Sequence, residues 1–125
     1  MNLKQEAEQF LKEKYDMVDF NSYQRSASRF AIYPDNQKLI YPALGMAGEA
    51  GEVANMVKKL IRDGPDNRPL TWRDDIGYEI GDVMWYCSEL ADNLNLSLGM
   101  IAAQNLAKLQ KRMDKGTLGG SGDTR

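Results

Sequence analysis

Apolar residues recur every three or four positions along most of the chain, which is the spacing that places them on one face of an α-helix. The pattern predicts a series of helices: residues 2–14, a segment that begins at Asn21 or Ser22 and ends at Pro34, and then 42–62, 72–94 and 98–113. The predicted fold class is therefore all-α. Because the short loop 63–69 joins the third and fourth helices, these two are expected to pack antiparallel in a helical bundle.

Polar residues predict where several of these helices begin. Asn21 or Ser22 is expected to cap the second helix, and Ser97 the last one, because short polar side chains accept hydrogen bonds from the first free amides of a helix. Thr71, followed three residues later by Asp74, has the form of a capping box for the fourth helix.

One acidic pattern occurs twice, in the third predicted helix and again in the fourth. Glu49 and Glu52 form the first pair, and Glu79 and Asp82 form the second. The members of a pair are three residues apart, so their carboxylates project from nearly the same side of a helix. On a helical wheel, Glu49 and Glu79 fall inside the apolar arcs of their helices. Glu52 and Asp82 lie at the edges of those arcs.

Carboxylates at the margin of a core need a physical explanation. Most Asp and Glu side chains are solvated at a surface, whereas acids gathered beside a core repel one another and lose hydration. A hard divalent cation such as Mg²⁺ removes both penalties, because it takes oxygen ligands. We therefore favour a metal site over four surface acids. Gly51 and Gly81, one inside each pair, suggest close approach of another helix or a ligand, since glycine is unfavourable within a helix.

The composition limits the kinds of partner and chemistry. The chain has 125 residues, which fits one domain, and a net charge of −2 at pH 7, which gives no reason to expect nucleic acid or an anionic membrane as partner. It contains no histidine, which excludes histidine-based catalysis. Cys87 is the single cysteine and is expected to be buried. A reducing compartment, a polar N-terminus and the lack of a long apolar run predict a cytoplasmic protein with no signal peptide.

A basic strip lies on the last predicted helix. Asn105, Lys108 and Arg112 share one polar edge beside its apolar stripe, and Lys59 on the third helix is a weaker addition. Taken alone, such a strip is better explained as a solvated helix face. Beside a metal held by acids, the same cations could bind and orient the oxygens of a polyphosphate.

The acidic pairs followed by this strip resemble the MazG family of nucleoside triphosphate pyrophosphohydrolases, in the all-α NTP pyrophosphatase superfamily. The resemblance implies hydrolysis of an NTP or dNTP to the monophosphate and pyrophosphate, in nucleotide-pool control. It also implies a homodimer or homotetramer, with the bundle completed by a second subunit. The implied site consists of Mg²⁺, with Mn²⁺ as the alternative ion, on Glu49, Glu52, Glu79 and Asp82, and of phosphates on Asn105, Lys108, Arg112 and Lys59.

The remaining roles in the site are less sharply marked. With no histidine, a water activated by the metal and a carboxylate is the economical nucleophile, and Glu49 or Glu52 is the expected base. Four residues are candidates for contacts with the nucleotide base, although aromatic residues at helical spacing more often belong to a core. These are Tyr23, Gln24, Trp85 and Tyr86.

Three segments follow from this interpretation: an N-terminal helical extension over 1–20, a MazG-like domain over 21–114 and a glycine-rich tail over 115–125. Many relatives carry a further Glu where this chain has Gly48. That difference keeps open a catalytically weak nucleotide- or metal-binding regulatory protein, and a purely structural bundle is a third reading. The tail is expected to be a flexible terminus, with a flap over the nucleotide or an arm onto a neighbouring subunit as alternatives.

Overall fold

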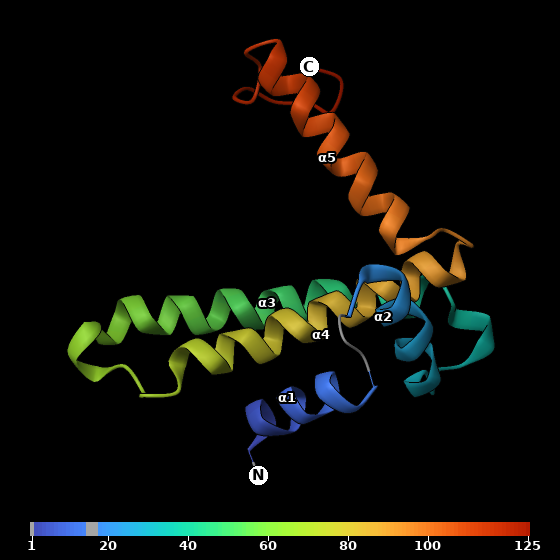
Figure 1. The fold of residues 1–125 in the computed structure, drawn as a ribbon. Helices are drawn as coiled ribbons and strands as arrows, with labels where there is room; N and C mark the ends of the chain where they lie inside the picture. The colour runs from blue at the N-terminus through green and yellow to red at the C-terminus, as the bar shows by residue number, and fades with distance from the viewer. Residues whose placement is uncertain (1, 15–17) are drawn as a thin grey trace.

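The computed structural model describes residues 2–14 and 18–125, and in these residues it contains helices and no strand. The all-α prediction is therefore confirmed. Five α-helices follow one another along the chain (Figure 1): α1 (Leu3–Lys14), α2 (Phe20–Ala27), α3 (Ile40–Asp63), α4 (Trp72–Asn93) and α5 (Leu98–Asp114). Three short 3₁₀ helices lie between them: η1 (Ser28–Phe30), η2 (Asp35–Gln37) and η3 (Pro65–Asn67).

The two long helices α3 and α4 run side by side as an antiparallel hairpin, as the short connection predicted (Figure 1). The helices approach closely at Gly45, where an added Cβ would overlap the ring of Tyr86. At Gly51 and Gly81 an added Cβ would meet no described atom within 4 Å, so the expected close approach at these glycines does not occur within this chain. Cys87 is half-buried rather than buried, with its Sγ 3.2 Å from the Sδ of Met46.

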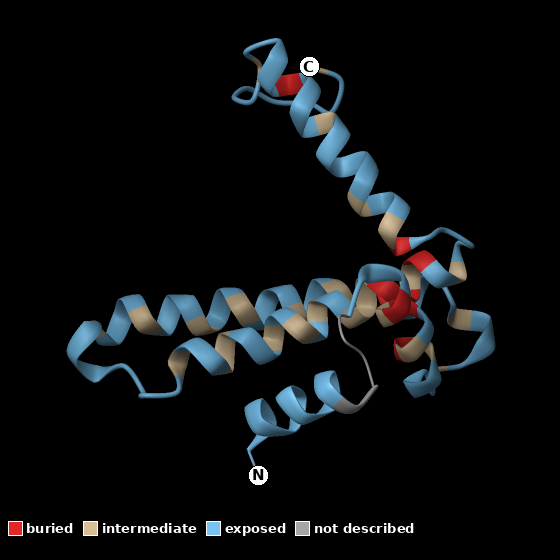
Figure 2. Ribbon diagram, viewed as in Figure 1, coloured by how far each residue is buried: buried red, intermediate tan, exposed pale blue. Residues whose placement is uncertain are grey.

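The best-buried part of the molecule lies where α2, the end of α4 and the start of α5 meet (Figure 2). Gln24 joins these elements, because its side-chain amide donates to the carbonyl oxygen of Leu96 at 2.8 Å and its Oε1 accepts from the Leu98 amide at 2.8 Å. The indole of Trp85 donates to the carbonyl oxygen of Ala27 at 3.1 Å. These bonds fix the point from which α5 leaves the rest of the chain.

α5 projects away from the α3–α4 hairpin, and most of its surface is exposed (Figures 1 and 2). Leu106 near its middle is 68% exposed. Apolar side chains on the hairpin are exposed as well, among them Leu44, Ile61 and Ile80. A single chain therefore leaves apolar helix faces exposed to solvent. The number of exposed apolar side chains favours a further packing partner. Among the described residues, no helix is long and apolar enough to cross a membrane.

The predicted helix starts are right at α5 and wrong at α2. Ser97 accepts a hydrogen bond from the Met100 amide at 3.1 Å and so caps α5. The residue that caps α2 is Asp19, which accepts from the Ser22 amide at 2.7 Å, while the Ser22 hydroxyl accepts from the Asp19 amide at 3.0 Å. This reciprocal pair starts the helix earlier than Asn21 or Ser22 would.

Two further details of the helix ends differ from the prediction. α2 ends at Ala27 and passes into η1, so it is shorter than a helix reaching Pro34. Thr71 occupies the position before α4 but makes no capping bond; its hydroxyl donates instead to the Asp75 carboxylate at 2.8 Å. The capping box with Asp74 was therefore wrong, because a side-chain acceptor one residue further on competes for the hydroxyl.

The C-terminal tail is folded rather than the flexible terminus that was expected. Gly116, Gly120 and Gly122 have φ values of 70°, 91° and 88°, a left-handed conformation that glycine adopts without steric cost. These residues turn the chain back on itself. The guanidinium of Arg125 then donates to the carbonyl oxygens of Gly119 at 3.0 Å and Thr117 at 3.2 Å.

Candidate functional site

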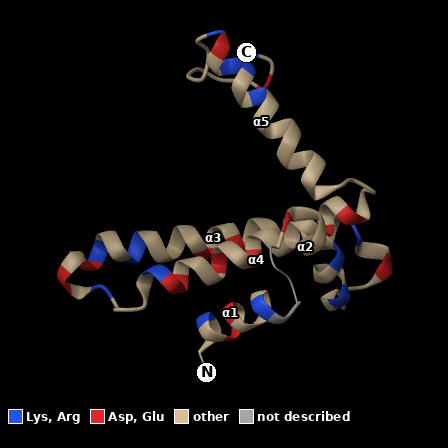
Figure 3. Ribbon diagram, in the orientation of Figure 1, with Lys and Arg blue, Asp and Glu red and all other residues tan. Residues whose placement is uncertain are grey.

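Three of the four predicted acids come together in the middle of the hairpin (Figure 3). Glu49 on α3 and Glu79 and Asp82 on α4 each offer a carboxylate oxygen, and these oxygens all lie within 4.8 Å of one another. Antiparallel packing places the two acidic pairs at the same level of the hairpin, which is why residues so distant in sequence meet. Glu49 and Glu79 are half-buried, and Asp82 is exposed.

The electrostatics of this cluster are those of crowded acids. The pKa of Glu49 is raised, first because its carboxyl group shares a hydrogen bond with Glu79, then by burial and by the negative charges of Asp82, Glu79 and Glu52. Carboxylate oxygens are the ligands that hard divalent cations prefer, so these residues fit such a cation.

Glu52 lies outside the three-acid cluster. Its side chain is exposed and lies one turn further along α3 than Glu49. Its negative charge contributes to the raised pKa of Glu49. The structure therefore brings together three of the four predicted metal ligands and leaves the fourth acid beside them. A free carboxylate next to a cation site has the chemistry of a general base.

The basic strip is not brought to the acids within one chain. Asn105 lies near the middle of α5, and Lys108 and Arg112 lie on its outer half. Because α5 runs away from the hairpin, the acidic and basic groups stand apart (Figure 3). Arg112 is only 6% exposed, and Lys108 is half-buried. The residues that bury them belong to the C-terminal tail, which contacts both cations. Lys59 is exposed on α3, on the hairpin itself.

The four candidates for base contacts fall into two groups. Gln24 and Trp85 are held by hydrogen bonds in the buried junction of α2, α4 and α5, so packing already occupies their polar groups. Tyr23 and Tyr86 lie closer to the acids. Burial and then the charge of Asp82 raise the pKa of Tyr23, and burial, Tyr41 and then Glu49 raise that of Tyr86.

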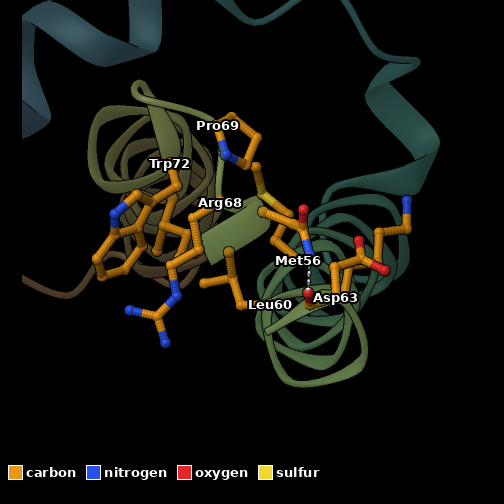
Figure 4. A pocket seen from close by; sticks show the side chains of 9 residues that line it. Met56, Leu60, Asp63, Arg68, Pro69 and Trp72 are labelled. Carbon is orange, nitrogen blue, oxygen red and sulfur yellow. Dashed lines mark hydrogen bonds between the residues drawn. The ribbon is translucent and has the colours of Figure 1, made fainter. Parts of the chain in front are cut away.

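A pocket that the sequence did not predict lies toward the loop end of the hairpin (Figure 4). Its volume is about 230 Å³, and its lining is mainly apolar with an aromatic wall and polar groups at its rim. The lining residues are Met56, Lys59, Leu60, Asp63, Asn67, Arg68, Pro69, Trp72 and Ile76. The Arg68 guanidinium lies 5.0 Å from the centre of the Trp72 ring. Such a lining suits a flat ligand with a polar edge.

The sequence contains the residues that line this pocket, but their spacing alone does not predict that they converge. The pocket walls are residues of α3 and α4 on either side of the loop 64–71 together with residues of the loop itself, and their convergence depends on the hairpin angle rather than on spacing. Met56 is one helical turn beyond Glu52, and Ile76 is one turn before Glu79. The pocket therefore begins about one turn from the acids along the hairpin.

Comparison with known proteins agrees with the acidic pattern. The family model of the MazG nucleotide pyrophosphohydrolase domain matches residues 38–117, a range that contains the three-acid cluster, Glu52 and the basic strip. The gene 37 protein of Mycobacterium phage L5 is 46% identical over 109 residues, which cover 82% of this chain and 96% of the phage protein. No solved structure matches the chain.

Proposed function

Because the chain belongs to the family of MazG nucleotide pyrophosphohydrolase domains, we propose that it hydrolyses an NTP or dNTP to the monophosphate and pyrophosphate, in control of the nucleotide pool. The observation that carries the proposal is the convergence of Glu49, Glu79 and Asp82 within 4.8 Å. This oxygen-only arrangement suits a divalent cation that accompanies a polyphosphate. A catalytically weak nucleotide-binding regulator of the same fold is the alternative.

In the proposed mechanism, Glu49, Glu79 and Asp82 would hold Mg²⁺, with Mn²⁺ as the alternative ion. When bound, such an ion neutralises charge on phosphate oxygens and lowers the pKa of a coordinated water. Glu52 is exposed beside the three acids and has room to take the proton of the attacking water. Hydrolysis breaks the α–β anhydride bond, and the bridging oxygen leaves with pyrophosphate or stays on the monophosphate according to the phosphorus attacked.

We further propose that the complete site combines two chains. The acids lie on the hairpin and the basic strip on α5, and one chain keeps them apart (Figure 3). A second copy could bring its α5 strip to these acids while covering the exposed apolar faces of α3, α4 and α5. The cations would then orient the phosphates and offset the charge that develops on them. A homodimer is the smallest assembly that meets this need, and a homotetramer could contain two such pairs.

The first test concerns the products. The full chain with Mg²⁺ and a panel of NTPs and dNTPs is expected to release pyrophosphate and the monophosphate in equal amounts, measured by ³¹P NMR. Omission of the divalent cation should abolish the reaction, because the acids then repel the substrate phosphates. Release of orthophosphate as the first product would contradict the proposal. Tight NTP binding without turnover would favour the regulatory alternative.

The second test concerns the shared site. Glu79→Gln chains and Arg112→Ala chains should each be inactive alone. Mixed in equal amounts under conditions of subunit exchange, they should regain about a quarter of wild-type activity, because half of randomly paired dimers contain one intact site of two. The matched control mixes Glu79→Gln with Asp82→Asn chains, whose lesions lie in the same half-site. If neither mixture recovers activity while exchange is demonstrated, the shared site is wrong.

A further inference from the structure

The folded tail places a carboxylate on the two cations of the basic strip. One oxygen of Asp123 lies 3.3 Å from the Nζ of Lys108 and 3.2 Å from the Nη2 of Arg112. The same Nη2 also donates to the backbone carbonyl oxygens of Asp123 at 3.1 Å and Gly122 at 3.3 Å. The cations that we assign to substrate phosphate therefore already bind an anion supplied by the chain itself.

The two partners of this contact differ in their surroundings. The Arg112 side chain is 7% exposed, whereas that of Asp123 is 86% exposed. The Nε of Arg112 is buried and has no hydrogen-bond partner among the described residues. The cation is thus fixed and incompletely satisfied, while the anion lies at the surface. Asp123 is already largely solvated and loses little when it returns to water, whereas the buried Arg112 then needs another anion in its place.

The space around this contact suits a larger anion. A cavity of about 390 Å³ opens beside Asp123 and carries four basic side chains on its walls. The basic residues are Lys108, Lys111, Lys115 and Arg125. A phosphate oxygen and a carboxylate oxygen are equivalent acceptors for guanidinium and ammonium groups, so they compete for the same N–H donors. Lys108, Lys111 and Lys115 lie on or next to α5 and stay there when the end of the tail moves, so the positive charge exceeds what a single carboxylate neutralises.

We propose that Asp123 is a displaceable latch: its carboxylate holds Lys108 and Arg112 while no nucleotide is bound, and a substrate phosphate group takes its place. The inference rests on the proposed function of the basic strip. The latched state lowers the apparent affinity for phosphate, because only the unlatched fraction of molecules offers both cations. On binding, the end of the tail moves away from α5 and the phosphate gains the donors that Asp123 gives up.

The first experiment measures phosphate affinity directly. Inorganic tripolyphosphate is titrated into the full chain and into an Asp123→Ala variant by calorimetry. The variant should bind about two- to fivefold more tightly, which is the range expected when a solvated carboxylate no longer competes for the two cations. Asp114→Ala is the matched control: it removes one negative charge at the end of α5, where Asp114 accepts from Gln110 at 2.9 Å and not from the strip. Equal affinity in wild type and Asp123→Ala, or weaker binding by the variant, would overturn the latch.

The second experiment follows the tail itself. The amide of Thr117 donates to the carbonyl oxygen of Arg112 at 2.7 Å, so hydrogen exchange over residues 116–125 reports whether the tail stays folded on α5. Tripolyphosphate should speed exchange in this segment in the wild type. Unchanged or slower exchange in the bound state would exclude displacement. Neither experiment requires hydrolysis. If the chain releases no pyrophosphate from any NTP, the proposed enzymatic function is refuted, and the two binding measurements still test the latch.

Discussion

Replacing Glu79 by Gln is expected to lower the rate of pyrophosphate release by about 100- to 1,000-fold, the loss typical when one preorganised polar contact to a reacting phosphate or its cation is removed. Glu79 stands at the centre of the site. It shares a hydrogen bond with Glu49 and contributes an oxygen to the three-acid cluster. A neutral amide keeps the size of the side chain but offers a weaker ligand for a divalent cation.

The same substitution has a second readout that does not depend on turnover. Mg²⁺ should raise the melting temperature of the wild type, because a ligand that binds only the folded state stabilises it. The rise should be absent in Glu79→Gln. Asp74→Asn is the matched control: Asp74 is an exposed acid in the first turn of the same helix, outside the cluster, and its loss should change neither readout. Activity of Glu79→Gln within about threefold of wild type would rule out a role for this acid as ligand.

The hairpin and the position of its acids could be predicted because helical periodicity and loop length determine them. Helical spacing sets which side of α3 and α4 each acid occupies, and a short loop forces the antiparallel pairing that joins the two pairs. That reasoning placed Glu49 and Glu79 deeper than Glu52 and Asp82, in agreement with their burial. It could not show that Glu52 stands outside the cluster, since that depends on the rotation of one helix against the other.

The direction of α5 could not be predicted, because long-range contacts set it. Asn95, in a left-handed conformation with φ of 57°, turns the chain after α4. Asn21 accepts from the Gly99 amide at 3.0 Å, and Gln24 accepts from the Leu98 amide at 2.8 Å, so α2 holds the first turn of α5. The sequence predicts other roles for these two side chains, Asn21 as a helix cap and Gln24 as a candidate for contact with the nucleotide base. For this reason the sequence placed the basic strip beside the acids, and the structure of one chain separates them.

Glu89 is the residue whose environment differs most from what its position suggested. In the sequence, Glu89 occupies in the second acidic repeat the position that Lys59 occupies in the first, and this suggested an acid that pairs with a lysine. In the structure it is 1% exposed, and its Oε1 has no hydrogen-bond partner among the described residues. Its pKa is raised, first by burial and then by the charge of Asp92. The negative charge of Asp92 therefore opposes its ionisation, and the neighbouring phenols of Tyr23 and Tyr33 carry no compensating positive charge.

Replacing Glu89 by Gln is expected to increase the free energy of unfolding at pH 7 by about 1–3 kcal/mol, because Gln does not ionise and each unit by which a pKa is raised corresponds to about 1.4 kcal/mol. The sign follows from linkage. With a raised pKa, the folded chain keeps a proton that the unfolded chain has already lost above the ordinary value of 4.5. The stability of the wild type should therefore fall as the pH rises from that value through the raised pKa, and the variant should lack this contribution.

Denaturant unfolding of both chains between pH 4.5 and 8 checks this, at one protein concentration so that any association is held constant. The difference in unfolding free energy should be small at the acid end and should grow toward neutral pH. Glu8→Gln on the exposed face of α1 is the matched control, and its difference from wild type should stay flat. A constant difference for Glu89→Gln, or a loss of stability at pH 7, would mean that the carboxylate is ionised and paired in the folded chain. The burial of Glu89 would then mark an unrecognised partner rather than a cost that the fold tolerates.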